Sequence, residues 1–289
     1  MTTFRRITSI ATLSAALALG ACASPSASEV TVTSTPVTSP PTVNTIAVIG
    51  DYGSGDENEQ AVAVLVAAAH PSAVFTVGDN VYSDGGYAHL VGDYYGDFIT
   101  TGRFYPATGN HDYSEGIEHY DSYFGTQRGA RYGEVTTGDI SFFVLDDQAA
   151  WDDPAYWQKQ QVWLKQVLAD SKSSYKVVLL HHPPFSSGSE HGYTPETQLD
   201  FSGMGADLVI AGHDHISERM QIDGISYLIA GAGGKNLYSC VVGQVTESVF
   251  CDDQHFAALF LEATVSELRG RFVAADGSTL DSFRVSPRR

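Results

Sequence analysis

The 289-residue sequence predicts an α/β fold, a layered αββα sandwich with two mixed β-sheets. From residue 44 onward, short β-rich runs alternate with runs whose apolar spacing is typical of helices. Near the C-terminus, several β-rich runs follow one another without a helix between them, which indicates closing antiparallel strands. With 43% hydrophobic and 11% aromatic residues, a chain of this length can bury a sizeable core. We therefore predict one globular domain over residues 44–289.

Each predicted element has its own local signal. The predicted strands are short runs rich in β-branched, aromatic or other apolar residues, and they cover residues 45–49, 73–77, 104–107, 140–145, 176–180, 208–211, 226–229, 257–262 and 270–274. The predicted helices have apolar residues three or four positions apart, and they cover residues 58–69, 87–99 and 154–169. Because the alternation of strands and helices gives way to hairpins, these elements fit a sandwich of two packed sheets.

The N-terminus has the features of an export signal. Arg5 and Arg6 precede an apolar run over residues 7–20 that is too short to span a bilayer, and small residues stand directly before Cys22. A cysteine in this place resembles the lipidation site of bacterial lipoproteins, whereas an ordinary signal peptide with an incidental cysteine is the alternative. We predict a signal peptide over residues 1–21 and a lipid anchor on Cys22. The protein is then expected outside the cytoplasm, as a bacterial cell-envelope lipoprotein or a secreted protein.

Residues 22–43 predict a flexible tether between this signal and the globular domain. After Cys22 the segment consists mostly of Ser, Thr, Pro, Ala and Val, with Glu29 as its single charge. Such a composition cannot bury enough apolar surface to offset the entropy of ordering the chain. Membrane attachment is therefore expected through the lipid alone, because no later run reaches about 18 apolar residues.

The two remaining cysteines, Cys240 and Cys251, have ten residues between them. In an oxidising compartment a nearby pair of this kind forms a disulfide by default, and two free buried thiols are the alternative. We predict the disulfide Cys240–Cys251.

The charge balance excludes some classes of partner. The sequence has 34 acidic and 16 basic residues, which gives a formal net charge of −18. No nucleic-acid partner is expected, because phosphate backbones are held by basic surfaces. An anionic substrate would need a strong local attraction in so acidic a protein, and a metal ion is the usual source of one.

A polar cluster follows each of five predicted strands. The clusters share Gly or Pro beside Asp, Asn, His or Tyr, and they read Gly50-Asp51-Tyr52-Gly53, Gly78-Asp79-Asn80-Val81-Tyr82, Gly109-Asn110-His111-Asp112, His181-His182-Pro183-Pro184 and Gly212-His213-Asp214-His215. Loops at the C-terminal ends of the strands line one crevice of an α/β sheet. Residues i and i+2 of an extended segment face the same side, so His213 and His215 can both reach a metal. The clusters together predict a metal site at these strand ends.

The ordered series Asp-x-Gly, Gly-Asp-x-x-Tyr, Gly-Asn-His-Asp, a strand ending in His, and Gly-His-x-His resembles that of the calcineurin-like metallophosphoesterases. More narrowly, it is similar to that of the purple acid phosphatases, especially the small tartrate-resistant type, over residues 45–235. Gly53 stands where many relatives have a histidine ligand, and Tyr82 stands where the purple acid phosphatases have a tyrosine instead. A phenolate is a hard anionic donor that suits trivalent iron. The resemblance thus implies a dinuclear centre of Fe(III) and a divalent ion, which could be Zn, Fe or Mn.

The resemblance also implies which residues hold the two ions. The iron ligands would be Asp51, Tyr82 and His215, with Asp79 as the bridge between the metals. The ligands of the divalent ion would be Asn110, His182 and His213. His181 and His182 are adjacent, so the register of the fourth cluster is ambiguous. We choose His182 because the family has a second histidine nine residues later in a Glu-His-Gly context, and His191 fits that count.

His111 and His191 would then be the catalytic histidines that face substrate, with His111 as the proton donor. The implied activity is hydrolysis of phosphate monoesters on small phosphorylated substrates, an acid phosphatase reaction by metal-bound hydroxide. Two cations would hold both anionic reactants, and a protonated histidine would protonate the leaving alkoxide and favour work below neutral pH. A phosphodiesterase or nucleotidase with the same site is one alternative. A non-catalytic lipoprotein that binds phosphate or metal is another, although it would not need the proton donor His111.

Two further polar features lie outside the five clusters. Asp146 and Asp147 follow the strand predicted over residues 140–145, and we interpret them as a turn or as support for the ligands. Lys235 follows a glycine-rich turn near the site and is a candidate contact for substrate phosphate.

Overall fold

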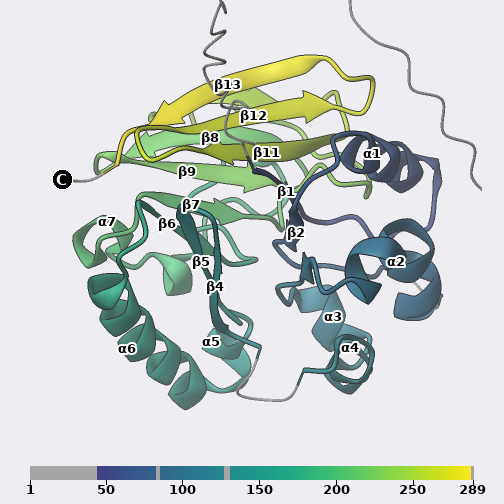
Figure 1. Cartoon of the computed structure of the whole chain (residues 1–289), viewed down its shortest axis with the longest axis horizontal. Coiled ribbons are helices and arrows are strands. Elements are labelled where there is room, and N and C mark those ends of the chain that lie inside the picture. Colours follow the sequence, from purple (N-terminus) through teal and green to yellow (C-terminus); the bar gives the residue numbers. More distant parts are fainter. Residues whose placement is uncertain (1–43, 83–84, 127–130, 288–289) are drawn as a thin grey trace, which may run out of the picture. The chain divides into compact units, whose positions relative to one another are not determined.

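The computed structural model describes residues 44–82, 85–126 and 131–287, and these residues form two mixed β-sheets packed against each other with helices on the outer faces (Figure 1). This is the predicted αββα sandwich. The predicted signal peptide over residues 1–21, the anchor Cys22 and the tether over residues 22–43 lie outside the described residues. Among the residues that the structure describes, no helix is both long enough and apolar enough to cross a membrane.

Both sheets are mixed because parallel strands are flanked by antiparallel ones. The six-stranded sheet has the order β13-β12-β11-β1-β2-β3, with the bounds Thr279–Val285, Leu268–Ala274, Ala257–Ala263, Thr45–Ile49, Ala73–Thr76 and Phe104–Tyr105. The seven-stranded sheet has the order β10-β8-β9-β7-β6-β5-β4, with the bounds Ser248–Asp252, Ser217–Ile222, Ile225–Ala230, Leu208–Ala211, Tyr175–Leu179, Ile140–Val144 and Gly133–Thr137. The pairs β1–β2, β2–β3, β5–β6, β6–β7 and β7–β9 are parallel, so the C-terminal ends of these strands share an edge within each sheet.

The helices connect the strands and cover the sheets. They are α1 to α7 with the bounds Glu57–Ala68, Asp93–Thr100, Asn110–Ser114, Ile117–Phe124, Ala149–Asp152, Pro154–Asp170 and Phe201–Met204. A π-helical turn, Ala88–Gly92, precedes α2, and a 3₁₀ turn, Pro195–Thr197, precedes α7. α1 begins where the side chain of Asp56 accepts the N–H groups of Asn58 and Glu59, and α6 begins at a proline, which has no N–H to leave unpaired.

Apolar residues of the two sheets meet in the central core. Phe75 of β2 stacks on Phe142 of β5 with ring centroids 4.0 Å apart, which joins the sheets directly. A second apolar cluster lies between the six-stranded sheet and helices α1 and α2, and a third lies between the seven-stranded sheet and α6. The core thus holds the strand ends, and the loops after them, in fixed positions.

Every predicted strand and helix is present in the structure, with ends that differ by up to a few residues. The helix predicted over residues 87–99 is the π-helical turn followed by α2. The prediction missed β4, β8, β10 and β13, along with the short helices α3, α4, α5 and α7. The missed strands carry polar residues among the apolar ones, so the apolar pattern that marks a buried strand is absent.

Candidate metal centre

The five polar clusters come together at the C-terminal ends of β1, β2, β3, β6 and β7, as predicted. The N–H of Asp51 donates to the carbonyl of Gly78 (3.1 Å), and the N–H of His213 donates to the carboxylate of Asp51 (3.0 Å). The N–H of His111 donates to Oδ1 of Asp79 (2.8 Å). The Asp51 carboxylate therefore joins loops of the two sheets, and the Asp79 carboxylate joins two loops of the six-stranded sheet.

The first group of ligand atoms surrounds the hydroxyl of Tyr82. This oxygen lies 3.0 Å from Oδ1 of Asp51, 2.9 Å from Oδ2 of Asp79 and 3.0 Å from Nε2 of His215. The carbonyl of Asn236 lies 2.7 Å from Nδ1 of His215, which leaves Nε2 as the ring nitrogen that faces the group. The four side chains predicted to hold one ion thus present their ligand atoms to a common point.

The second group surrounds Nε2 of His181. This nitrogen lies 2.9 Å from Oδ1 of Asn110, 3.2 Å from Nδ1 of His213 and 3.4 Å from Oδ1 of Asp79. Asp79 therefore contacts Tyr82 with one carboxylate oxygen and His181 with the other. A carboxylate that faces two ligand groups with different oxygens has the geometry of a bridge between two ions.

The structure differs from the sequence prediction at the fourth cluster, where His181 rather than His182 contacts Asp79 and Asn110. The carbonyl of Val77 lies 2.8 Å from Nδ1 of His181 and thereby turns Nε2 toward the site. His182 lies beside it, with its Nδ1 2.8 Å from Oδ2 of Asp147. The same carboxylate accepts the backbone N–H of His181 with Oδ1 and that of His182 with Oδ2. His182 still belongs to one candidate ligand group with His181 and His213.

Strand alternation carried the signal that the nine-residue count missed. Val177 and Leu179 face the core between the sheets, whereas Val178 and Leu180 face the core beneath α6. Continuing this alternation by one residue places His181 on the inner side, toward the other sheet and its loops. The count to His191 gives no such information, because the loop between the two histidines can lengthen without moving either end.

Several ligand residues have strained backbone conformations. Asp51, Asp79 and His213 have φ angles of 56°, 52° and 69°, in the left-handed region that residues other than glycine rarely adopt. Neighbouring glycines let the loops approach the carboxylates: a Cβ at Gly109 would lie 2.2 Å from Asp79 Oδ1, and one at Gly212 would lie 2.4 Å from Asp51 Oδ2. Strain of this kind persists only where the surrounding structure holds it, which is typical of functional sites.

Gly53 has no room for any side chain. A Cβ at this position would lie 1.9 Å from the carbonyl oxygen of Asn80, and the carbonyl of Gly53 accepts the N–H of Tyr82 (2.9 Å). The first loop is thus packed directly against the second, and the histidine that many relatives carry here cannot be accommodated without moving the backbone.

Burial shifts the pKa values of the site residues, and Asp79 and His181 form an oppositely charged pair. Burial raises the pKa of Asp51 well above its ordinary value. Burial also opposes ionisation of Asp79, but the charge of His181 lowers the pKa of Asp79 to about 2. Burial disfavours the charged form of His181, yet Asp79 raises the pKa of His181 to about 10. Burial lowers the pKa of His213 and lowers the pKa of His215 to about 4, so these two rings are neutral, the form that binds metals.

Asp112 supports the second and third loops from behind. This buried carboxylate accepts the N–H of Gly109, the side-chain amide of Asn80 and the hydroxyl of Tyr87, each at 2.8 Å. The three bonds tie the loop that carries Asp79 to the turn that begins α3. Asp112 is therefore a positioning residue for Asn110 and His111 rather than a ligand.

Asp214 supports the loop that carries His191 in the same way. Its carboxylate accepts the hydroxyl of Ser186 (2.6 Å) and the N–H groups of His191 (3.2 Å) and Gly192 (3.0 Å). Because Asp214 stands between His213 and His215 in the chain, it links this loop to the ligands of both groups.

The two histidines predicted to face substrate lie on different sides of the site. The ring of His111 is 4.3 Å from the ring of Tyr82, beside the first group. His191 stacks on His213 with ring centroids 3.9 Å apart, beside the second group, and burial lowers its pKa. Both predicted positions therefore border the ligand groups.

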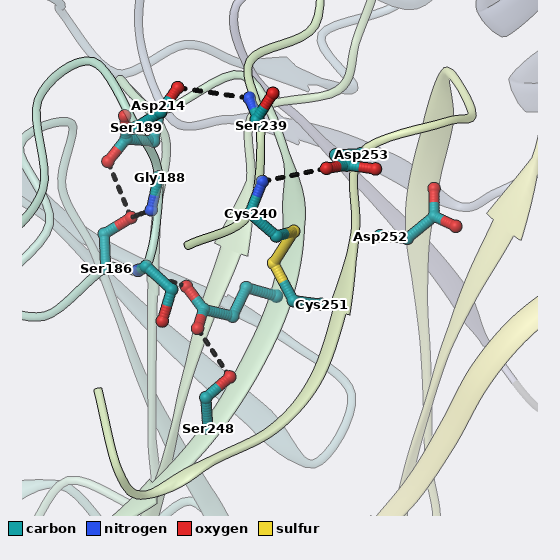
Figure 2. The surroundings of a disulfide bond; sticks show 12 residues. Ser186, Gly188, Ser189, Asp214, Ser239, Cys240, Ser248, Cys251, Asp252 and Asp253 are labelled. Carbon is teal, nitrogen blue, oxygen red and sulfur yellow. Dashed lines mark hydrogen bonds between the residues drawn. A yellow bond between two sulfur atoms is a disulfide. The ribbon is translucent and has the colours of Figure 1, made fainter. Parts of the chain in front are cut away.

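The predicted disulfide between Cys240 and Cys251 is confirmed, with the two Cα atoms 6.3 Å apart (Figure 2). Cys240 pairs with Gly188 through an antiparallel bridge, and its N–H donates to Oδ2 of Asp253 (2.9 Å). Figure 2 shows how the disulfide-closed segment lies against the loop around Gly188, which leads to His191. The disulfide therefore fixes one wall of the site.

Aromatic rings complete the walls. Tyr238 stacks on His215 with ring centroids 4.1 Å apart, and its N–H donates to the carbonyl of His215 (3.1 Å). On the other side, the exposed ring of Trp151 lies 4.6 Å from the ring of His182. Neither aromatic was predicted as part of the site, since isolated aromatics in sequence more often indicate core packing.

Comparison with known proteins adds a family and a set of folds. Residues 44–217, more than half of the chain, match the family model described as calcineurin-like phosphoesterase. No match was found among curated protein sequences.

Among solved structures, GAP50, "the anchor in the inner membrane complex of Plasmodium", superposes with a TM-score of 0.69 at 15% identity, over 86% of this chain and 90% of that one. The purple acid phosphatase PPD1 from yellow lupin seeds has a TM-score of 0.68 at 18% identity, over 84% of this chain. The match spans 54% of the lupin protein, so this chain covers about half of its length. PhoD has a TM-score of 0.51 at 13% identity. At these identities the likeness is one of fold.

Proposed function

Because this chain belongs to the calcineurin-like phosphoesterase family, we propose that it is an acid phosphatase of the purple type that hydrolyses phosphate monoesters. The family implies a metal cofactor, and we propose Fe(III) with a divalent ion, Zn, Fe or Mn. The observation that carries the proposal is the position of the Tyr82 hydroxyl, within 3.0 Å of ligand atoms from Asp51, Asp79 and His215. A phenol, two carboxylates and an imidazole form a hard donor set that fits trivalent iron. Gly53, which has no room for a histidine, supports the same choice.

We assign the ligands from the contacts that the site makes. Asp51, Tyr82 and His215 would hold the iron, and Asp79 would be shared. Asn110, His181 and His213 would hold the divalent ion. His181 takes the place that the sequence alone assigned to His182, because Nε2 of His181 faces Asp79, Asn110 and His213.

The chain's own groups would orient the substrate and move one proton. When bound, the two cations would neutralise the phosphate and lower the pKa of a coordinated water. His111, beside the first group, would donate a proton to the oxygen of the departing alcohol, since an alkoxide leaves poorly unless it is protonated. His191, held by Asp214 through the backbone, would contact the phosphate from the side of the second group.

We also propose that the mature protein is anchored outside the cytoplasm by a lipid on Cys22. The disulfide between Cys240 and Cys251 supports an oxidising compartment, because such bonds persist there and are rare in the cytosol. Mass spectrometry of the protein from its native membrane tests the anchor. A diacylated Cys22 at the mature N-terminus is expected, and an unmodified cysteine would contradict it.

Metal analysis with visible spectroscopy tests the proposed centre. We expect near one iron and one divalent ion per chain, with a tyrosinate charge-transfer band that Tyr82→Phe abolishes. A colourless protein with two divalent ions would contradict the iron assignment and leave phosphoester hydrolysis in place. Rates on matched mono- and diester substrates separate the monoesterase from the phosphodiesterase. A metal-loaded protein with no activity on either substrate would favour a binding role without catalysis. GAP50, which shares the fold, is described as an anchor.

A further inference from the structure

We infer that Lys235 binds the phosphate group of the substrate beside the first ligand group and thereby contributes to the choice of substrate. This inference rests on the proposed function. Five observations support it. They are the fixed backbone of the segment after β9, the position of the lysine ammonium, its lack of a salt bridge among the described residues, the negative net charge of the protein and the contacts at the far end of the segment.

The backbone of Lys235 is fixed directly at the site. Its N–H donates to the carbonyl of Asp51 (2.9 Å), and the N–H of Gly233 donates to the carbonyl of Gly50 (3.0 Å). Gly234 is packed so closely that a Cβ there would lie 2.8 Å from the Cα of Glu59. The lysine side chain therefore starts from a point that cannot move without disturbing the first loop.

The ammonium lies beside the first group. Nζ of Lys235 is 4.9 Å from the centroid of the Tyr82 ring, and that ring is 4.3 Å from the ring of His111. Lys235 and the proposed proton donor thus border the same tyrosine. A group held between them is within reach of both, given the flexible four-carbon stem of lysine.

This ammonium forms no salt bridge in the described part of the chain. Arg131, for comparison, pairs with Asp121 and approaches Asp146, whereas Lys235 has no carboxylate within ion-pair distance among the described residues. Of the lysine and arginine side chains in residues 44–82, 85–126 and 131–287, Lys235 is the one that contacts a proposed metal ligand. Its cation–π contact with Tyr82 is compatible with a phosphate on its other side.

The negative net charge of the protein gives this lysine a role in attracting phosphate. The chain carries a formal net charge of −18, so a phosphate dianion is repelled by the protein at long range. A partly buried ammonium next to the ligand groups attracts the dianion locally and forms charge-assisted hydrogen bonds with its free oxygens. A diester has one charge fewer and less free oxygen to offer, so the lysine favours monoesters.

The far end of the segment is also held. Tyr238 donates its N–H to the carbonyl of His215 (3.1 Å) and stacks on that ring, and Cys240 is tied by the disulfide to Cys251. The segment between Lys235 and Cys240 is therefore attached to two residues of the first group, Asp51 and His215, and keeps the ammonium in place.

Binding of inorganic phosphate to the metal-loaded full chain tests the inference without turnover. We expect Lys235→Met to weaken phosphate binding about tenfold or more, with KM for a monoester raised more than kcat is lowered. Lys235→Arg should retain most of the affinity, because it keeps the charge. Lys165→Met, which removes the same charge from an exposed position on α6, should bind phosphate as the unchanged protein does.

Two outcomes would overturn the inference while the proposed function stands. In the first, Lys235→Met binds phosphate as tightly as the unchanged, active enzyme. In the second, Lys235→Met loses metal or the charge-transfer band and Lys235→Arg does not restore phosphate affinity, which would make the lysine a support for Tyr82. An unchanged protein that hydrolyses no phosphate ester would instead contradict the proposed function, and the inference with it.

Discussion

Oδ1 of Asp79 lies 3.4 Å from Nε2 of His181, and the other oxygen of the same carboxylate lies 2.9 Å from the hydroxyl of Tyr82. This relationship makes Asp79 the meeting point of the two ligand groups. It also identifies His181 as the member of the adjacent pair that faces the site. The neighbouring His182 is instead held by Asp147.

Substitution of the two adjacent histidines is expected to give unequal results. His181→Ala removes the nitrogen that contacts Asp79 and Asn110, so it should lose the divalent ion and lower activity by at least about 100-fold. His182→Ala should keep both ions, because its Nδ1 faces Asp147. Metal content and activity of the two variants, purified alike, check this. Retention of both ions in His181→Ala and loss in His182→Ala would restore the original choice of His182.

Gly53 is expected to tolerate no side chain. Gly53→Ala places a Cβ 1.9 Å from the carbonyl of Asn80, so it should lower the free energy of unfolding by about 2 kcal/mol or more. Gly96→Ala is the matched control, because a Cβ at Gly96 meets nothing within 4 Å and lies in a helix that favours alanine. Chemical denaturation of both variants measures the difference. Equal stability for Gly53→Ala would show that the two loops can separate.

Strand ends could be located from the sequence because continuous apolar runs such as Thr45–Ile49 mark fully buried strands. The metal-binding residues could then be predicted, because each polar cluster comes directly after such a run. β8 was missed because it contains Glu218, a buried carboxylate that a sequence pattern assigns to the surface. Its charge is compensated by the N–H of Ser187 (2.8 Å) and the hydroxyl of Ser248 (2.6 Å), which are distant in the chain. Only the tertiary fold brings these partners together, so the local sequence pattern does not reveal them.

The difference between local pattern and tertiary contacts also explains why His182 was chosen in the fourth cluster. The choice between His181 and His182 depends on which ring the carbonyl of Val77 and the carboxylate of Asp147 hold, and these two partners lie in the loops after β2 and β5. The residue types and the loop were predicted, whereas the orientation of each ring required the tertiary contacts.

Glu59 is expected to make stability depend on pH. Burial raises the pKa of this carboxyl on α1 from 4.5 to about 8, and the N–H of Gly55 donates to it (2.8 Å). Because the pKa is higher in the folded state, the folded protein binds more protons than the unfolded chain between these two values. Stability should therefore fall as pH rises from 4.5 through about 8.

Glu59→Gln keeps the shape of the side chain and cannot ionise, so it should reduce this fall and exceed the unchanged protein in stability at the upper pH. Glu57→Gln, at an exposed position of the same helix, is the control. Thermal unfolding of the three proteins at about pH 5 and about pH 8 measures the effect. Parallel pH profiles for all three would contradict the role of Glu59.

The disulfide is expected to support both stability and the wall beside His191. Replacing Cys240 and Cys251 by serine should lower the free energy of unfolding by about 3 kcal/mol, since the bond closes a loop in the unfolded chain. It should also raise KM, because Cys240 pairs with Gly188 in the loop that leads to His191. Unfolding and kinetics with and without a reductant check this. A reductant should lower the free energy of unfolding and raise the KM of the unchanged protein, and it should change neither quantity in the double variant.

His111 is expected to matter in proportion to how poorly the alcohol leaves. Its ring lies 4.3 Å from Tyr82, and its N–H is fixed to Asp79, so the imidazole has a defined place beside the first ligand group. His111→Ala should lower kcat about 100-fold or more on an alkyl phosphate, which needs its leaving oxygen protonated. On a nitrophenyl phosphate the loss should be small, because nitrophenolate leaves without a proton. His119→Ala, an exposed histidine on α4, is the matched control and should follow the unchanged enzyme on both esters. If His111→Ala lowers kcat equally on the two substrates, the residue positions phosphate instead of donating a proton.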